Sequence, residues 1–179
     1  MTDYLESVEK IAKEIVAKNA TEVDQTGAFP QAAIDALRDS GMLGLISAKS
    51  VGGLGQGPRA AALVVERLAR ECASTAMVTC MHYTATAVIE KYGAEAVRKQ
   101  LAQGNHLATL AFSEAGSRSH FWAPVSTARR DQNGICLNAR KNWVTSAHHA
   151  TLHVWSSKPI AAEGASTLWL VPSDSSGIS

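Results

Sequence analysis

The residues best suited to chemistry lie between Leu110 and Thr145. A short apolar run there breaks into small hydroxylated residues and glycine, in the order Leu110, Ala111, Phe112, Ser113, Glu114, Ala115, Gly116, Ser117, Arg118, Ser119. Hydroxyls and unhindered backbone N–H groups at the end of a strand suit a polar ligand laid against the chain. This stretch therefore predicts a binding site for a polar ligand.

A second stretch, Trp143-Val144-Thr145, complements the first. On a strand, positions 143 and 145 face the same side. The indole then supplies a flat apolar surface, and the neighbouring hydroxyl supplies a hydrogen bond. That pair suits a planar heteroaromatic cofactor, so we expect the two stretches to line one cofactor site.

Together the two stretches resemble the flavin-binding signature of the acyl-CoA dehydrogenase family, which typically reads T-E-P-G-A-G-S-D and later W-I-T-N. Ser113-Glu114 matches T-E, Gly116 matches the first glycine, and Ser119 matches the serine. Residues 143–146 match W-I-T-N without a gap, and the spacing between the two halves also fits.

The signature itself has three departures, and the rest of the chain has further matches. Ala115 stands where the family has proline, Arg118 replaces the second glycine, and His120 replaces the aspartate. Residues 51–55 are similar to the family's Y-G-G-L-G, with valine for tyrosine, and residues 91–104 are similar to its turn into the middle domain. The resemblance thus runs along the whole chain.

The spacing of apolar residues changes from helical to strand-like near His106. It predicts helices over residues 4–18, from Pro30 to a left-handed stop at Gly41, and over residues 58–73, 74–92 and 94–103. It predicts strands over residues 107–113, 125–130, 135–140, 151–157 and 167–172, with a hairpin turn at residues 131–134. Ser74 is expected to cap its helix, and His82 within that helix to be a hydrogen-bonded interior histidine.

We therefore expect an α+β fold: an all-α helical bundle over residues 1–105, then the first strands of a β-barrel-like domain over residues 106–179. The resemblance implies that the family continues for roughly as many residues again. The chain is expected to be truncated relative to the family and inactive alone, because the family's catalytic carboxylate lies in the C-terminal domain. The stop at Ser179 also fits a non-catalytic binding subunit completed by another chain, although a truncated product is favoured.

The resemblance implies an FAD-dependent acyl-CoA dehydrogenase, which forms a double bond between Cα and Cβ of an acyl-CoA thioester. A carboxylate removes the α-proton while the β-hydrogen leaves as hydride to the flavin. The same resemblance implies a dimer or tetramer of identical chains and, as partner, electron-transfer flavoprotein or another acceptor. A flavin monooxygenase or oxidase of the same superfamily is the alternative.

The resemblance also assigns roles to individual residues. The flavin is expected to contact Leu110, Phe112, Ser113, Gly116, Ser119, Trp143, Val144 and Thr145. Ser119 is also expected to meet the acyl-CoA, and Arg118 to pair with a CoA phosphate or an acidic acyl group. No catalytic residue is assigned, because Glu114 corresponds to a position that supports structure. The simpler alternatives are turn residues for the serines, core for Trp143, and a solvated loop position for Arg118.

The composition excludes several other classes. A net charge of +1 with interspersed signs provides no basic patch, so neither nucleic acid nor a membrane surface is expected as a partner. Three cysteines without a C-x-x-C pair indicate a reducing, cytoplasmic setting. The N-terminus lacks the apolar core of a signal peptide, and no stretch is long and apolar enough to span a membrane.

Two further patterns are not expected to bind a cofactor. Residues 51–55 lack the G-x-G-x-x-G spacing and the strand–turn–helix setting of a nicotinamide site. His149 and His153 have four-residue spacing, with His148 beside them, but a strand is predicted after Ala147. On a strand that spacing does not bring two imidazoles to one ion, so no metal site is expected.

Overall fold

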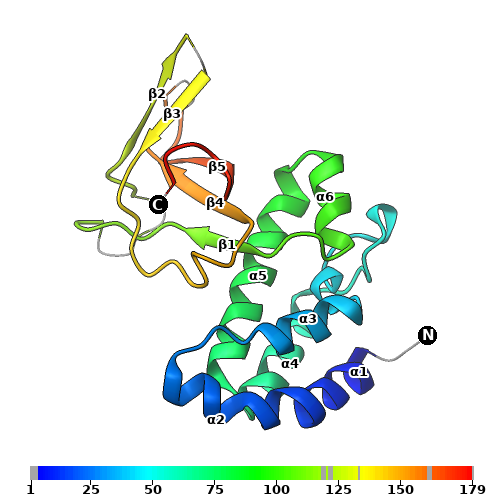
Figure 1. The fold of residues 1–179 in the computed structure, drawn as a ribbon. Coiled ribbons are helices and arrows are strands. Elements are labelled where there is room, and N and C mark those ends of the chain that lie inside the picture. Colours follow the sequence, from blue (N-terminus) through cyan, green and yellow to red (C-terminus); the bar gives the residue numbers. More distant parts are fainter. Residues whose placement is uncertain (1–3, 118–119, 121–122, 133, 161–162, 179) are drawn as a thin grey trace.

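Helices and strands occupy separate stretches of the chain in the computed structural model (Figure 1). The helices lie within residues 4–102, and the strands lie within residues 108–172. The structure describes residues 4–117, 120, 123–132, 134–160 and 163–178. The predicted α+β class, with a helical N-terminal part followed by strands, is confirmed.

The N-terminal helical segment is longer than predicted. It consists of α1 (Tyr4–Ile11), a π-helical turn (Ala12–Val16) and α2 (Ala17–Thr26). The predicted end at residue 18 is wrong, because Val23 extends the buried stripe beyond it. Gly27, with φ 67°, then adopts the left-handed conformation that ends the helix.

The remaining helices match the predicted ones, with shifted ends. They are α3 (Gln31–Asp39), α4 (Pro58–Ala69), α5 (Ala73–Tyr92) and α6 (Glu95–Ala102), with 3-10 turns η2 (Met42–Gly44) and η3 (Lys49–Val51). Gly41 takes the expected left-handed conformation, with φ 75°. The expected Ser74 cap is wrong, because the Cys72 Sγ accepts the Thr75 N–H at 3.5 Å and caps α5 instead.

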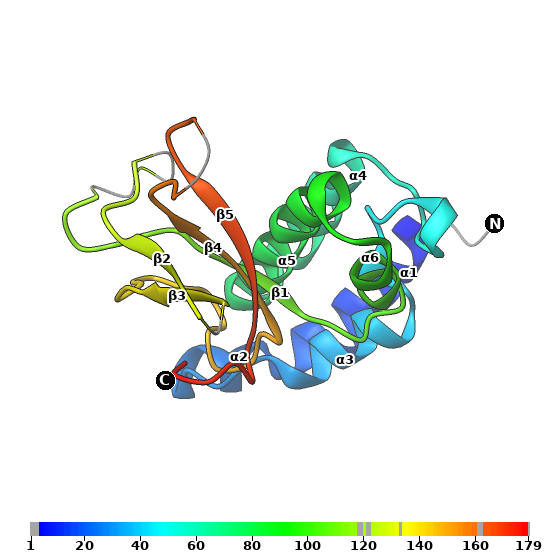
Figure 2. The same cartoon turned by 90° about the horizontal axis from the view of Figure 1, so that it is seen from above.

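Helix α5 contributes to both hydrophobic cores. The first core lies among the helices and includes Ala76, Val78 and Tyr83 of α5. The second core joins α5 and α6 to the strands, through Ala85, Ile89, Leu101, Ala108, Leu152 and Val154. Strand β1 (Ala108–Ala111) accordingly runs beside α5 in both views (Figures 1 and 2). The first strand is therefore anchored to the helical part by apolar burial.

The strands form two sheets. One contains β1, β4 (Leu152–Ser157) and β5 (Thr167–Pro172), and the other is a hairpin of β2 (Thr127–Asp131) and β3 (Gly134–Asn138). Strand β1 pairs parallel with β4, and β4 pairs antiparallel with β5. The hairpin confirms the turn predicted at residues 131–134, of which Asn133 lies outside the described residues.

Two strands end earlier than predicted. Strand β1 ends at Ala111 rather than at residue 113, and β3 ends at Asn138 rather than at residue 140. The chain after β3 follows an irregular path, with a turn over residues 145–149. The expectation that Trp143 and Thr145 share one face of a strand is therefore wrong.

Candidate functional site

The two halves of the predicted flavin signature lie side by side. The Asn142 N–H donates to the Ser113 carbonyl at 2.9 Å, and Glu114 and Lys141 form an antiparallel β-bridge. These contacts join the segment that follows β1 to the segment that follows β3. The structure therefore brings together the stretches that the sequence predicted to line one site.

Strand β1 positions the first half of the signature. Leu110 and Phe112 are half-buried and pack against the second core. Leu110 pairs in register with Val154 of β4, so the sheet fixes its backbone. Ser113, also half-buried, then leads into a turn at residues 115–117.

The turn after β1 contains a required glycine and a structural serine. Gly116 has φ 89°, a conformation that L side chains rarely adopt. The buried Ser117 hydroxyl donates to the Glu114 carbonyl at 2.9 Å, so the turn-residue alternative is confirmed for this serine. Arg118 and Ser119 lie outside the described residues, and their roles stay predictions.

Trp143 occupies an irregular segment with an uncommon backbone conformation. Its φ is 58°, and Ser146, three residues on, has φ 53°. Positive φ is rare for a bulky residue and incompatible with a strand. Among the described residues, Trp143 is 93% exposed and belongs to neither hydrophobic core. Backbone strain of this kind clusters at binding and active sites, so Trp143 is a candidate ligand contact.

Val144 and Thr145 are half-buried and offer hydrogen-bonding groups beside that ring. The Thr109 hydroxyl donates to the Thr145 carbonyl at 2.8 Å, which ties this segment to β1. Within the described part of the chain, no residue accepts a hydrogen bond from the backbone N–H of Val144 or of Thr145. Both groups are thus available to a ligand.

An open hollow of about 1200 Å³ adjoins this segment. Trp143 and Val144 line it together with residues of β3, β4 and β5, among them Trp155 and Trp169. Polar residues such as Arg140, His148 and His153 line it as well, so its walls are of mixed polarity. In the described structure, the buried Nε1 of Trp155 and Nδ1 of His153 have no hydrogen-bond partner.

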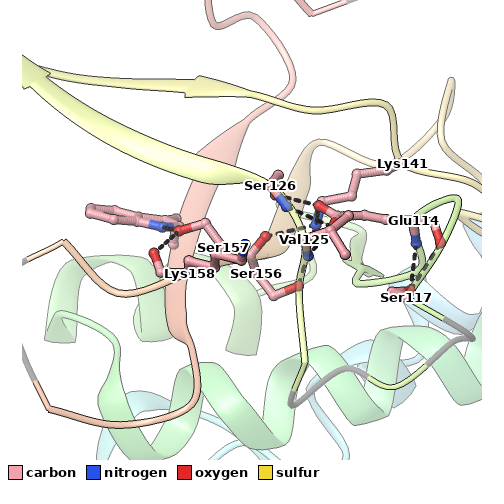
Figure 3. A network of polar contacts seen from close by, with 9 residues as sticks. Glu114, Ser117, Val125, Ser126, Lys141, Ser156, Ser157 and Lys158 are labelled. Carbon is pink, nitrogen blue, oxygen red and sulfur yellow. Dashed lines mark hydrogen bonds and ion pairs between the residues drawn. The ribbon is translucent and has the colours of Figure 1, made fainter.

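Glu114 and Lys141, one from each of the two segments that follow β1 and β3, form a buried ion pair (Figure 3). The Lys141 Nζ donates to Glu114 Oε1 at 2.7 Å and to the Ser156 carbonyl, on β4, at 2.7 Å. The Glu114 Oε2 accepts the Val125 and Ser126 N–H groups at 2.7 and 3.0 Å, and the Ser126 hydroxyl donates to Oε1. The side chains of Glu114 and Lys141 are only 3% and 4% exposed.

This environment determines the charge states of the pair. Burial raises the pKa of the Glu114 carboxyl, but the hydrogen bonds from Lys141, Ser126 and the two backbone N–H groups outweigh it and lower that pKa to about 2. Burial lowers the pKa of the Lys141 ammonium, and Glu114 offsets part of that effect. A shielded carboxylate with so low a pKa is a poor general base, which agrees with the structural role expected for Glu114.

The sequence pattern did not single out Lys141, Ser126 or Ser156. Ser126 and Lys141 contact Glu114 from 12 and 27 positions away along the chain, and Ser156 contacts Lys141. No local spacing in the sequence reveals such contacts. A lysine two positions before Trp143, in the second half of the signature, is the one signal available in the sequence.

His149 and His153, at four-residue spacing, lie in different surroundings. His149 stacks on Phe29, with ring centroids 3.9 Å apart and an interplanar angle of 5°. His153 lies buried on β4, with Nε2 3.3 Å from the Ala147 carbonyl. The strand predicted directly after Ala147 is wrong, since residues 145–149 form a turn. Across the described ranges, no three His, Cys, Asp or Glu side chains are grouped so that they could hold a metal ion.

His82 is the hydrogen-bonded interior histidine that the sequence predicted. It is fully buried, and its Nδ1 accepts the Ala108 N–H at 3.1 Å. Its Nε2 lies 2.9 Å from the Leu43 carbonyl, to which the neutral ring donates. Burial lowers its pKa to about 4 despite that carbonyl. His82 therefore links α5 to η2 and β1 as a neutral imidazole.

The helices of the described residues differ from membrane-spanning ones. None of them combines the length and apolarity needed to cross a bilayer.

Known proteins share both parts of this architecture. Residues 2–104 match the acyl-CoA dehydrogenase N-terminal domain, and residues 109–179 match the acyl-CoA dehydrogenase middle domain. A 3-sulfinopropanoyl-CoA desulfinase of Advenella mimigardefordensis is 30% identical over 151 residues, covering 81% of this chain and 37% of the relative. A probable acyl-CoA dehydrogenase of Mycobacterium leprae is 30% identical over 149 residues, covering 81% and 38%. The chain thus spans just over a third of the length of these relatives.

Solved structures share the fold at lower identity. Butyryl-CoA dehydrogenase from Megasphaera elsdenii has a TM-score of 0.82 at 22% identity, covering 99% of this chain and 50% of that one. Methanesulfinate monooxygenase MsuC from Pseudomonas fluorescens has a TM-score of 0.82 at 24% identity, covering 99% and 45%. TdsC from Paenibacillus sp. A11-2, in a complex with FMN and indole, has a TM-score of 0.83 at 23% identity, covering 97% and 44%.

The two domain matches follow each other along nearly the whole chain, in the order in which the structure places helices and strands. The chain therefore belongs to the acyl-CoA dehydrogenase family.

Proposed function

We propose that the protein is an FAD-dependent acyl-CoA dehydrogenase and that residues 110–119 and 143–145 bind its flavin. The observation that carries this proposal is the 93% exposed indole of Trp143, on a backbone with positive φ, beside the available N–H groups of Val144 and Thr145. A flat apolar surface next to hydrogen-bond donors fits an isoalloxazine, which has an apolar ring and a polar edge.

Each segment has a distinct part in holding the cofactor. Trp143 packs against the ring, while Val144 and Thr145 supply hydrogen bonds to its polar edge. Leu110, Phe112, Ser113 and Gly116, brought alongside by the Asn142–Ser113 hydrogen bond, contact the other part of the ring. When bound, the flavin supplies the hydride acceptor.

Acyl-CoA is the proposed substrate. The two curated relatives bear the names of a CoA-thioester desulfinase and of a probable acyl-CoA dehydrogenase, which supports a CoA thioester for this protein too. Ser119 is proposed to meet flavin and thioester, and Arg118 to pair with a phosphate or an acidic acyl group. The carboxylate that removes the α-proton is proposed to lie outside residues 1–179, in the family's C-terminal domain. We also propose that the intact protein forms a dimer or tetramer of identical chains. Its electron acceptor is proposed to be electron-transfer flavoprotein or another acceptor.

An anaerobic mixing experiment tests this proposal. The intact protein, loaded with FAD, is mixed with a panel of saturated acyl-CoAs, and the absorbance of the oxidised flavin is followed. Loss of that absorbance at about 1 to 10³ per second is expected with at least one acyl-CoA, and none with free CoA. Retained flavin that no acyl-CoA bleaches would show that the substrate class is wrong. Failure to retain any flavin would show that the cofactor assignment is wrong.

A flavin monooxygenase is the second candidate. Arg118 and His120 stand where the signature has glycine and aspartate, so the sequence departs from the dehydrogenase pattern at these two positions. The fold is as similar to that of the methanesulfinate monooxygenase as to that of the butyryl-CoA dehydrogenase, with a TM-score of 0.82 in both cases. Turnover that requires oxygen and fails with an artificial dye acceptor would favour this candidate, whereas turnover with the dye alone would favour the dehydrogenase.

A further inference from the structure

The Glu114–Lys141 pair ties together four separate segments of the strand region. Glu114 follows β1, Ser126 precedes β2, Lys141 follows β3, and Ser156 belongs to β4. We call these four residues the clamp. Within it, Glu114 accepts hydrogen bonds from Ser126 and Lys141, and the Lys141 ammonium also donates to Ser156, as Figure 3 shows. The clamp therefore fixes the positions of these segments relative to one another.

A buried ion pair is an expensive way to join segments. Removing two charges from water costs free energy, which their attraction returns only when the geometry is good and further hydrogen bonds are made. Apolar residues of similar volume frequently stabilise a fold as well or better. Hydrogen bonds to charged groups have narrow preferred directions, so they define orientation in a way that apolar contact does not. This points to positioning as the purpose of the pair.

The clamp is directly continuous with the proposed flavin contacts. Ser113 precedes Glu114 in the chain, and Trp143 follows Lys141 by two residues. Between them, the Asn142 N–H donates to the Ser113 carbonyl at 2.9 Å. A shift of either charged side chain would thus move one flavin-facing segment relative to the other.

We infer that Glu114 and Lys141 are a positioning pair that sets the spacing and orientation of the two flavin-facing segments, an inference that rests on the proposed function for its ligand. Neither side chain has to touch the flavin. The pair acts through Ser113 on one side and through the segment from Asn142 to Trp143 on the other.

Lys141→Met and Glu114→Gln in the intact protein test this inference. The first leaves a buried carboxylate without its cation, and the second is nearly isosteric and removes the negative charge. Each folded variant should bind FAD at least about tenfold more weakly and show an altered absorption envelope of the bound flavin. Lys141→Arg, which keeps the cation, should recover part of the affinity. If Lys141→Met does not fold, Glu114→Gln decides the outcome.

A second measurement does not depend on the flavin. In flavin-free protein, hydrogen exchange of the Asn142 amide should be at least about tenfold faster in both variants than in the wild type. The Thr151 amide donates to the carbonyl of Leu107, the residue just before β1, at the end of that strand away from Ser113. It is the internal reference, and its exchange rate should not change. Because this readout needs no ligand, it separates the positioning inference from the proposed function. Wild-type protein that binds no flavin would count against the proposed function and not against the positioning inference.

Arg98→Met provides a matched control. Arg98 pairs with Glu90 between α6 and α5, another largely shielded ion pair, at 2.8 Å. Its loss should lower stability and leave FAD affinity and Asn142 exchange unchanged. If Glu114→Gln and Lys141→Met behave like Arg98→Met, the pair is merely structural and the inference is wrong.

Discussion

The hydroxyl of Thr109 holds the carbonyl of Thr145 at 2.8 Å, and so fixes the segment that carries Trp143 against the first strand. Thr109 is fully buried on β1, directly beside α5 and the second core. The exposed indole is therefore carried by a segment whose backbone is anchored to the most buried part of the strand region. A loop held in this way can keep a strained conformation that the loop alone would not maintain.

Removing this anchor should have a measurable cost. Thr109→Val keeps the shape of the side chain and deletes the hydroxyl, while the Ser146 hydroxyl still donates to the same carbonyl. We expect a loss of about 1 kcal/mol in the free energy of unfolding, measured by urea titration. Thr109→Ser, which keeps the hydroxyl, should lose less than Thr109→Val. Equal losses in the two variants would show that the hydrogen bond contributes nothing.

Trp143 should matter for the cofactor and not for folding. Because its side chain is 93% exposed, Trp143→Ala should change the free energy of unfolding by no more than about 0.5 kcal/mol. FAD affinity should fall at least about tenfold, and the flavin absorption envelope should change. Both are measured by titration of the apoprotein.

Trp169, which also lines the hollow, offers a contrast to Trp143. Its Nε1 donates to the Ser157 hydroxyl at 2.8 Å, and its ring is half-buried on β5. Trp169→Ala should therefore destabilise the fold by a few kcal/mol. A Trp143→Ala variant that unfolds as readily as Trp169→Ala would contradict the assignment of Trp143 to a ligand.

The regular elements could be predicted because their signals are local. Apolar residues at three- and four-residue spacing mark the helices of residues 30–40 and 58–73, and apolar residues nearly all round mark that of residues 74–92; the structure confirms each with shifted ends. The end of α2 was missed because residues 19–26 are mostly polar. Val23 alone continues the buried stripe there, supported by packing that a local pattern does not contain.

The conformation at Trp143 could not be predicted, and neither could the clamp. The predicted strand over residues 135–140 was expected to continue towards Trp143, whereas Trp143 and Ser146 have positive φ in a segment that the Thr109–Thr145 hydrogen bond ties to β1. Likewise, Lys141 reaches Glu114 across 27 positions. The signature predicted which two stretches meet, whereas the ion pair that joins them depends on the tertiary fold.

Stability should fall in mild acid because of His82. Burial lowers its pKa in the folded protein to about 4, from 6.5 in an exposed histidine. Between these values the unfolded chain binds a proton that the folded protein does not, so stability decreases as the pH falls from about 6.5 to about 4. The slope approaches about 1.4 kcal/mol per pH unit in that window.

Urea titrations across that pH range measure the effect of His82. His82→Gln should flatten the dependence between pH 6.5 and 4 while lowering stability at pH 7. Tyr83→Phe is the matched control, since it removes the neighbouring buried hydrogen bond to the Met42 carbonyl and leaves the imidazole in place. It should lower stability and keep the slope. An unchanged slope in His82→Gln would assign the acid sensitivity to other groups.

The last prediction concerns the stacked pair Phe29 and His149, which joins the helical part to the turn that follows Thr145. Their rings lie 3.9 Å apart and nearly parallel, between the segment after α2 and the turn at residues 145–149. A double-mutant cycle of Phe29→Ala and His149→Ala should give a coupling of about 0.5 to 1.5 kcal/mol in the free energy of unfolding. Because His149 belongs to the same turn as Thr145, we also expect His149→Ala to weaken FAD binding a few-fold. The double variant Phe29→Ala/His149→Ala should bind FAD as well as His149→Ala alone. Strictly additive effects on stability would show that the two rings are neighbours without a productive contact. A larger loss of FAD affinity in the double variant than in His149→Ala would show that Phe29 acts on the site by another route.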